Sequence, residues 1–112
     1  MRIAAIDHLY AETLEWEESV AFWERLGFGF VDRWGDEGHR AGRLECNDAA
    51  LVLAEITEGD PAFNVFFELQ DPDSGTTDLS GVVTPLSDTH WGTRWIRLAD
   101  PEGRIHVLEE AP

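Results

Sequence analysis

The chain has 112 residues, 43% of them hydrophobic, and its 8 basic and 23 acidic residues give a net charge of −15. This length predicts one domain over residues 1–112. So strong a negative charge repels phosphate backbones and argues against nucleic acid as a partner. It suits a cationic ligand, and it is also typical of a highly soluble or salt-adapted protein.

The chain has no apolar run near the roughly 20 residues that cross a membrane, so we expect no membrane partner. It also lacks the basic start and apolar stretch of a signal peptide. Cys46 is the only cysteine, so no internal disulfide can form. We therefore expect a cytoplasmic protein.

The first half of the chain predicts the element order β-α-β-β-β. Apolar alternation predicts a strand over residues 2–10, and Thr13 is placed to cap a helix that ends at Gly27. A strand over 28–34 and a turn over 35–39 then lead into a hairpin. The helix carries an apolar stripe at helical spacing, made of Trp16, Val20, Trp23 and Leu26, with Phe22 on its flank.

The second half begins in the same way, with a strand over residues 64–69. Residues 71–80 contain Pro, Gly and Thr without an apolar stripe, so we expect the second helix to be shortened or lost. Such a loss leaves part of a sheet uncovered unless a loop or another subunit lies over it, which favours a homodimer.

A repeat joins the two halves: residues 40–55 match residues 94–109 without a gap, at a constant offset. A repeat this long in a short chain indicates a duplicated module. The predicted fold class is therefore α+β, with two tandem βαβββ modules over residues 1–58 and 62–110 that form a curved mixed sheet with a cleft.

The repeated hairpin predicts which side chains share a face. If residues 100–103 (DPEG) form a four-residue turn, Ile96 lies opposite Val107 on an aliphatic core face, and Arg97 lies opposite His106 on a mixed face. That mixed face is typical of a ligand-binding cleft, although an ordinary solvent-exposed face is the alternative. It would carry Trp95, Arg97, His106 and Leu108, with Ala41, Arg43, Val52 and Ala54 in the first copy, and Phe66 and Glu68 on the strand from residue 64.

Four segments resemble the vicinal oxygen chelate superfamily, which contains glyoxalases, extradiol dioxygenases and bleomycin resistance proteins. They are residues 19–28 (SVAFWERLGF), 90–92 (HWG), 100–103 (DPEG) and 105–107 (IHV), and the likeness is greatest to bleomycin resistance proteins. This resemblance implies duplicated βαβββ modules and a drug bound without metal, between aromatic side chains in clefts at a dimer interface.

The resemblance places Phe66 and Trp91 at aromatic cleft positions, with Trp34 in the region where further aromatic residues lie. The face argument adds Trp95. Trp16 and Trp23 belong to the helix stripe and are expected in the core. The predicted ligand-binding residues are Trp34, Phe66, Glu68, Trp91, Trp95, Arg97 and His106.

A metal centre is the alternative interpretation. The positions at which metal enzymes of the superfamily hold their ligands read His8, Val52, Asn64 and His106 in this chain. Two imidazoles without a carboxylate do not make a 2-His-1-carboxylate site, although Glu68 or Glu110 could complete one. We therefore favour no metal and no cofactor, with a divalent metal on His8 and His106 as the alternative.

The sequence thus predicts a binding protein of the bleomycin-resistance type, which sequesters a small aromatic and cationic molecule and so confers antibiotic resistance. It contains no recognisable nucleophile, acid/base pair or phosphate-binding loop, so we predict no catalytic residue. The alternatives are a metal-dependent lyase, isomerase or dioxygenase of the same superfamily, and a module that binds a protein partner.

Overall fold

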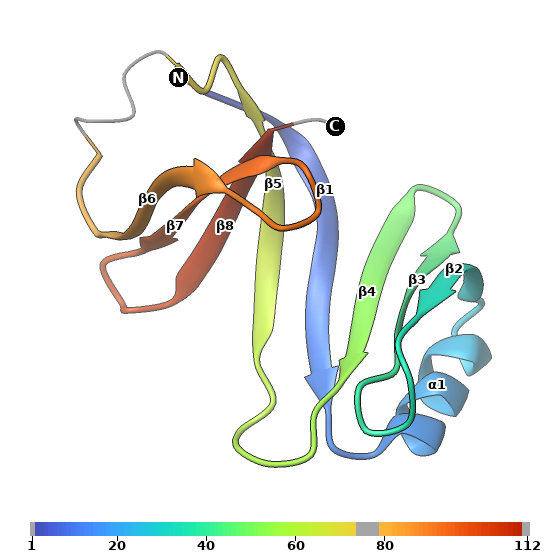
Figure 1. Ribbon diagram of the computed structural model, residues 1–112. Helices are drawn as coiled ribbons and strands as arrows, with labels where there is room; N and C mark the ends of the chain where they lie inside the picture. Colours follow the sequence, from blue (N-terminus) through green and yellow to red (C-terminus); the bar gives the residue numbers. More distant parts are fainter. Residues whose placement is uncertain (1, 74–78, 111–112) are drawn as a thin grey trace. The chain divides into compact units, whose positions relative to one another are not determined.

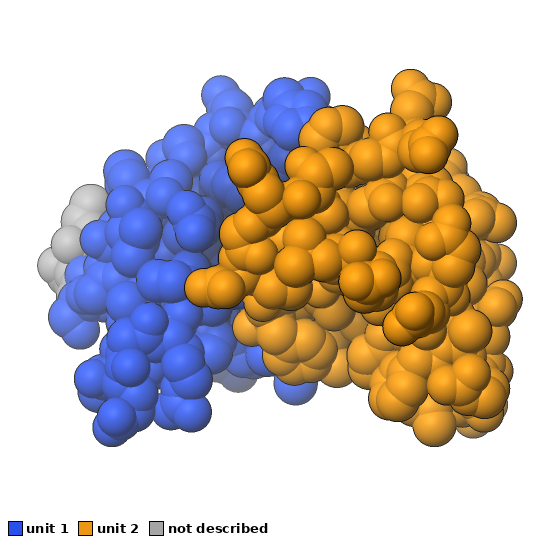
Figure 2. Space-filling view, turned by 90° about the horizontal axis from the view of Figure 1, so that it is seen from below, with its two compact units in different colours: residues 1–7, 64–112 blue, residues 8–63 orange. Residues whose placement is uncertain are grey.

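The structure, a computed structural model, describes residues 2–73 and 79–110. Its chain divides into two compact units (Figure 2). The first unit, so called because it holds the first module, is residues 8–63, drawn in orange as unit 2. The second unit is residues 1–7 with 64–112, drawn in blue as unit 1. The single domain predicted for residues 1–112 stays a prediction. The elements are β1 (Arg2–Thr13), α1 (Trp16–Arg25), β2 (Gly29–Trp34), β3 (Ala41–Cys46), β4 (Ala49–Glu55), β5 (Phe63–Gln70), β6 (Val82–Asp88), β7 (Arg94–Ala99) and β8 (Ile105–Glu110).

In the first unit the strands lie in the order β2-β3-β4-β1 (Figure 1). β3 is antiparallel to both β2 and β4, whereas β4 is parallel to β1. A two-residue turn joins β3 to β4, because Cys46 pairs with Ala49 and Asn47 takes a positive φ of 53°. This register confirms the face predicted for Ala41, Arg43, Val52 and Ala54.

Helix α1 covers the hydrophobic core of this unit. Trp16 is buried and packs with Leu44, Leu51 and Leu53, which are each at most 1% exposed. Val20 and Trp23 join the same cluster, as the stripe predicts, but Leu26 is 57% exposed. Among residues 2–73 and 79–110, no helix is long and apolar enough to span a membrane.

The start of α1 differs from the prediction. The N-cap residue is Glu15, and Thr13 instead accepts a hydrogen bond on Oγ1 from the Glu15 backbone N–H at 2.9 Å. Thr13 ends β1, so its hydroxyl stabilises the turn between strand and helix rather than the helix itself. At the other end, Leu26 is the C-cap and Gly27 follows with φ 101°, as predicted.

In the second unit, β5, β8, β7 and β6 lie side by side in that order (Figure 1). β5 is parallel to β8, β8 is antiparallel to β7, and β7 is antiparallel to β6, which repeats the pairing of the first unit. The α+β class and the duplicated module are therefore confirmed. The buried core is Leu69, Ile96 and Leu108, with Phe67, Leu79, Leu86 and Leu98 packed against it.

The second helix was expected to be shortened or lost between residues 71 and 80. Of that segment, residues 74–78 lie outside the described part of the chain. Residues 71–73 and 79–80 are not helical, so α1 is the one helix among the described residues.

The register of the second hairpin differs from the prediction by one residue. Ile96 pairs with Leu108 rather than Val107, and Val107 takes the place predicted for His106 opposite Arg97. The predicted four-residue turn over residues 100–103 is wrong, because Asp100 is still paired with the opposite strand. Its backbone N–H donates to the Arg104 carbonyl oxygen at 2.9 Å.

The loop itself explains this difference. Three residues, 101–103, lie between the bonded pair, and Gly103 takes a φ of 84°. This is the arrangement of a three-residue hairpin loop with a glycine bulge. The Asp100 carboxylate fixes it by accepting hydrogen bonds on Oδ1 from the backbone N–H groups of Glu102 and Arg104, at 2.9 and 3.0 Å.

An ion pair that is repeated in both units shows the one-residue shift in register directly. Arg40 donates from Nε and Nη2 to the two carboxylate oxygens of Glu55, both at 2.8 Å. Arg94 makes the same two-pronged contact with Glu110, at 3.0 and 2.9 Å. The counterpart of Glu55 is therefore Glu110, although the ungapped sequence repeat matches Glu55 with Glu109.

The Arg40–Glu55 pair predicts a pH dependence of stability. Hydrogen bonding to Arg40, aided by backbone N–H groups, lowers the pKa of Glu55 from 4.5 to about 2. Between these values the unfolded chain binds more protons than the folded one, so this contribution is complete above about pH 4.5 and is lost as the pH falls towards 2. We expect Glu55→Gln to lower the urea midpoint at pH 7 and to flatten its fall below pH 4.5.

The matched control is Glu58→Gln, an exposed residue of the same unit. Urea midpoints measured from pH 2 to 7 should keep the wild-type slope in this variant. An equal change of slope in both variants would contradict the assignment to Glu55.

A close approach at Gly42 gives a second prediction. A Cβ there would lie 2.7 Å from the Asp32 carbonyl oxygen and 2.6 Å from the Phe30 ring. Gly42→Ala should therefore lower the free energy of unfolding by about 1–3 kcal/mol through overpacking. Gly29→Ala is the control, since a Cβ at Gly29 meets nothing within 4 Å. Urea denaturation measures both, and equal stabilities would contradict the argument.

Candidate functional site

Two rows of paired residues cross one face of the sheet in the second unit. Side chains of paired residues point to the same face of a sheet, so each row forms a continuous strip. The first row is Glu68, Glu109, Trp95 and Ser87, and the second is Phe66, Val107, Arg97 and Thr84. These rows, together with Trp91, are the aromatic-acidic face. Four predicted ligand residues, Phe66, Glu68, Trp95 and Arg97, thus share one face.

Trp91 reaches this face from the tight loop between β6 and β7. The loop is closed by hydrogen bonds from the Thr89 N–H to the Thr93 carbonyl at 2.8 Å and from the Thr93 N–H to the Thr89 Oγ1 at 3.0 Å. The Trp91 indole N–H donates to Glu109 Oε2 at 2.7 Å, which anchors a ring that remains 49% exposed.

The aromatic rings of this face form a corner. Trp91 stands edge-on to Trp95, with ring centroids 5.2 Å apart and planes at 90°. The Phe66 ring is tilted against that of Trp95, with centroids 6.3 Å apart and planes at 49°. Two perpendicular indole rings offer a stacking surface and an edge at once, an arrangement that suits a flat aromatic molecule or a cation.

Two carboxylates lie beside this corner. Glu68 pairs directly with Glu109, so two negative side chains are neighbours on one face. Glu109 Oε2 also accepts a hydrogen bond from the Thr93 hydroxyl at 2.5 Å, and Thr93 is buried, so this carboxylate is held in place. Like charges on paired residues destabilise a sheet. The two rows carry one guanidinium, Arg97, against these two carboxylates, so they retain an attraction for a cation.

The sequence analysis missed Glu109. With a four-residue turn, Glu109 falls on the core face opposite Arg94, whereas the observed register puts it opposite Trp95. Gly103 at the third position of the loop was the available signal, because three-residue hairpin loops place a glycine there.

His106 lies on the opposite face of this sheet, which corrects its predicted place beside Arg97. It pairs with Leu98, and its ring is 6.2 Å from that of Phe67. Its Nε2 lies 2.8 Å from Asp100 Oδ2. This contact with His106, together with backbone and Arg104 hydrogen bonds, holds the pKa of Asp100 well below its usual range.

The other predicted ligand residue, Trp34, belongs to the first unit and is 48% exposed. Its strip there consists of Glu12, Ala54, Ala41 and Trp34. Next to it, Tyr10 pairs with Val52 as Phe66 pairs with Val107 in the second unit. Burial, and then a hydrogen bond to Glu12, raises the pKa of Tyr10 well above its usual range, so it remains a neutral phenol. The sequence analysis missed Tyr10. The available signal was the match of residues 10–12 (YAE) with residues 66–68 (FFE), which places Tyr10 at the position of Phe66.

The candidate metal ligands belong to both units rather than to one. His8 is 9% exposed on β1 of the first unit, and Asn64 donates from Nδ2 to the Ile105 carbonyl at 2.9 Å. Glu110, offered as a possible completing ligand, is held by Arg94. Within residues 2–73 and 79–110, no three or more His, Cys, Asp or Glu side chains gather in a group that could hold a metal ion.

No family model and no curated protein sequence matches this chain. Solved structures do match its fold. A glyoxalase/bleomycin resistance protein/dioxygenase superfamily member from Vibrio splendidus 12B01 has a TM-score of 0.72 at 14% identity, over 93% of this chain and 97% of that one. Methylmalonyl-CoA epimerase from Mycobacterium tuberculosis has a TM-score of 0.70 at 18% identity, over 98% and 90%.

These matches confirm the fold that the resemblance implies: the chain has the fold of the glyoxalase/bleomycin resistance protein/dioxygenase superfamily. A bleomycin resistance determinant encoded on the transposon Tn5 also matches, at 23% identity over 90% of this chain and 92% of that one. Its TM-score of 0.38 is too low to carry a structural argument.

The adjacent carboxylates give a prediction that needs no ligand. Glu68→Gln should raise the free energy of unfolding by roughly 0.2–1 kcal/mol at low salt, because it removes a like-charge neighbour of Glu109. The gain should shrink as salt screens the repulsion. Urea denaturation at two salt concentrations measures it. Glu102→Gln, an exposed change of the same charge in the hairpin loop, is the control, and an equal gain there would assign the effect to net charge alone.

Proposed function

We propose that this protein binds and sequesters a small aromatic, cationic molecule without a metal, in the manner of bleomycin resistance proteins. The observation that carries the proposal is the strip of Glu68, Glu109 and Trp95 with Trp91 set edge-on against it. Aromatic faces attract a cation through the ring quadrupole, and two carboxylates beside them add charge attraction.

The geometry favours a ligand with a flat ring and a positive group. The ring would stack on Trp95 or Trp91, and the positive group would lie between the carboxylates of Glu68 and Glu109. Phe66 and Arg97 lie on the same face, and Arg97 would orient any acceptor that the ligand carries. The chain's net charge of −15 would speed the approach of a cation.

Sequestration requires no chemical step, since a tightly bound compound no longer reaches its target. The proposal includes a cytoplasmic location and a role in antibiotic resistance. A homodimer is part of the same proposal, and Trp34 stays a predicted ligand residue. The fold supports the proposal, because it matches that of a member of the glyoxalase/bleomycin resistance protein/dioxygenase superfamily.

The test is a tryptophan-fluorescence titration with metal-free bleomycin on chelator-treated protein, repeated with added divalent metal. We expect saturable quenching at about one site per chain, the same with and without metal. Trp95→Leu should weaken binding about tenfold, a loss within the range of cation–aromatic contacts. Glu109→Gln should weaken it severalfold, with a smaller dependence on salt.

The matched control is Glu102→Gln, which changes the net charge equally but lies in the hairpin loop. Binding unchanged in Trp95→Leu and Glu109→Gln would refute the aromatic-acidic face as the site. No response without metal, combined with stoichiometric metal uptake that His8→Ala abolishes, would support the metal-dependent enzyme instead.

A further inference from the structure

The carboxylates of the aromatic-acidic face have oxygens that accept no hydrogen bond. Within residues 2–73 and 79–110, Glu68 makes no hydrogen bond and no ion pair, although the residue is partly buried. Its cross-strand neighbour Glu109 accepts on Oε2 alone, from the Trp91 indole N–H at 2.7 Å and from the Thr93 hydroxyl. Both oxygens of Glu68 and Oε1 of Glu109 therefore remain to accept from a ligand.

The guanidinium of the neighbouring row does not fill this gap. Arg97 lies opposite Val107 and Thr84, and no ion pair joins it to Glu68 or Glu109 in the described part of the chain. A ligand that displaces solvent from a partly buried carboxylate must supply hydrogen-bond donors, because a desolvated acceptor without a donor costs free energy. Charge alone does not meet this requirement.

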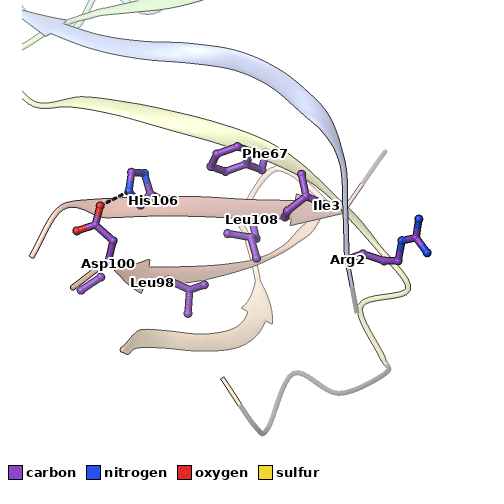
Figure 3. Close-up of a pocket in the computed structure, with 8 residues that line it drawn as sticks. Arg2, Ile3, Phe67, Leu98, Asp100, His106 and Leu108 are labelled. Carbon is purple, nitrogen blue, oxygen red and sulfur yellow. Dashed lines mark hydrogen bonds and ion pairs between the residues drawn. The ribbon is translucent and has the colours of Figure 1, made fainter. Parts of the chain in front are cut away.

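The opposite face of the same sheet gives a contrast. It holds an open, mainly apolar groove beside Phe67 and Leu108, and Figure 3 shows Asp100 there, bonded to His106. The Asp100 carboxylate also accepts from backbone N–H groups and from the Arg104 guanidinium. Its oxygens are already satisfied, so a cation gains more from the aromatic-acidic face.

The need for donors separates the candidate cations. A quaternary ammonium group attracts carboxylates by charge but carries no N–H. A primary ammonium group has N–H donors, but it is compact, strongly hydrated and not flat. An amidinium or guanidinium is planar and more weakly hydrated, stacks on aromatic rings, and presents parallel N–H groups that match a carboxylate.

We propose that the cationic group of the ligand is an amidinium or guanidinium. Its N–H groups donate to Glu68 and to Glu109 Oε1, and its plane stacks on the indole of Trp91 or Trp95. Neighbouring strands lie about 4.8 Å apart, so carboxylates on paired residues are within reach of one such group. This inference rests on the proposed function and narrows its ligand from any aromatic cation to one with planar N–H donors.

The test compares benzamidinium with phenyltrimethylammonium, two phenyl-bearing cations of equal charge of which only the first has N–H donors. Isothermal titration calorimetry of the whole chain, with chelator present, measures both affinities. We expect benzamidinium to bind about tenfold tighter, as one hydrogen bond to a charged group allows. Benzylammonium, which has N–H donors without the plane, should bind severalfold more weakly than benzamidinium. The NMR signal of the Trp91 indole N–H should shift when benzamidinium is added.

The outcomes separate this inference from the proposed function. Benzamidinium affinity no higher than that of either other cation would overturn the inference, and so would the absence of saturable benzamidinium binding. The bleomycin titration judges the function independently. Saturable binding of bleomycin, with equal affinities for the three cations, would leave the proposed function standing. No binding of bleomycin or of any of the three cations would refute both.

A charge-removing variant locates the N–H contacts. Glu68→Gln is expected to stabilise the fold slightly, so a loss of binding in this variant does not reflect unfolding. The ratio of benzamidinium to phenyltrimethylammonium affinity should fall severalfold in Glu68→Gln. Glu102→Gln, which changes the net charge equally in the hairpin loop, should keep the wild-type ratio. An unchanged ratio in Glu68→Gln, or an equal fall in both variants, would overturn the inference.

Discussion

The register of one hairpin determines the chemistry of the second unit. Three loop residues, 101–103, set the pairing of β7 with β8, and this pairing places Glu109 beside Trp95, Glu110 beside Arg94 and His106 beside Leu98. Side chains alternate along a strand, so a shift of one residue would exchange the two faces of β8. The acidic partner of the indole rings, Glu109, and the place of His106 on the opposite face both depend on this loop.

Comparison of the two modules shows which contacts the one-residue shift in hairpin register changed and which it left unchanged. Each retains a two-pronged Arg–Glu pair at the edge of its hairpin, Arg40 with Glu55 and Arg94 with Glu110. Next to that pair, the strip Glu12, Ala54, Ala41 and Trp34 of the first unit corresponds to Glu68, Glu109, Trp95 and Ser87 of the second. In the first unit the two central residues of the strip are the small Ala54 and Ala41. In the second unit the same positions hold Glu109 and Trp95.

Sequence patterns predicted the parts of this fold that depend on local periodicity. The repeat gave the duplicated module and the register of the first hairpin, and alternation placed Phe66 and Glu68 on one face. The place of His106 and the role of Glu109 could not be obtained from an ungapped repeat, because the two hairpin loops differ in length by one residue. The hydroxyl of Thr13 suits a helix cap, which is why the sequence predicts one there, but β1 extends to Thr13 and its hydroxyl stabilises the turn. Such errors arise where a loop, rather than a strand or helix, decides the geometry.

The glycine bulge at Gly103 also bears on how a duplicated fold acquires new specificity. With a loop one residue shorter, the same strand sequences would present Leu108 and His106 beside Trp95 and Arg97, and would turn Glu109 towards the core. Insertion or deletion in this loop therefore exchanges an acidic surface for an imidazole without a single substitution in the strands. In such a protein, divergence of ligand preference between relatives can lie in loop length, where a comparison of aligned residues would overlook it.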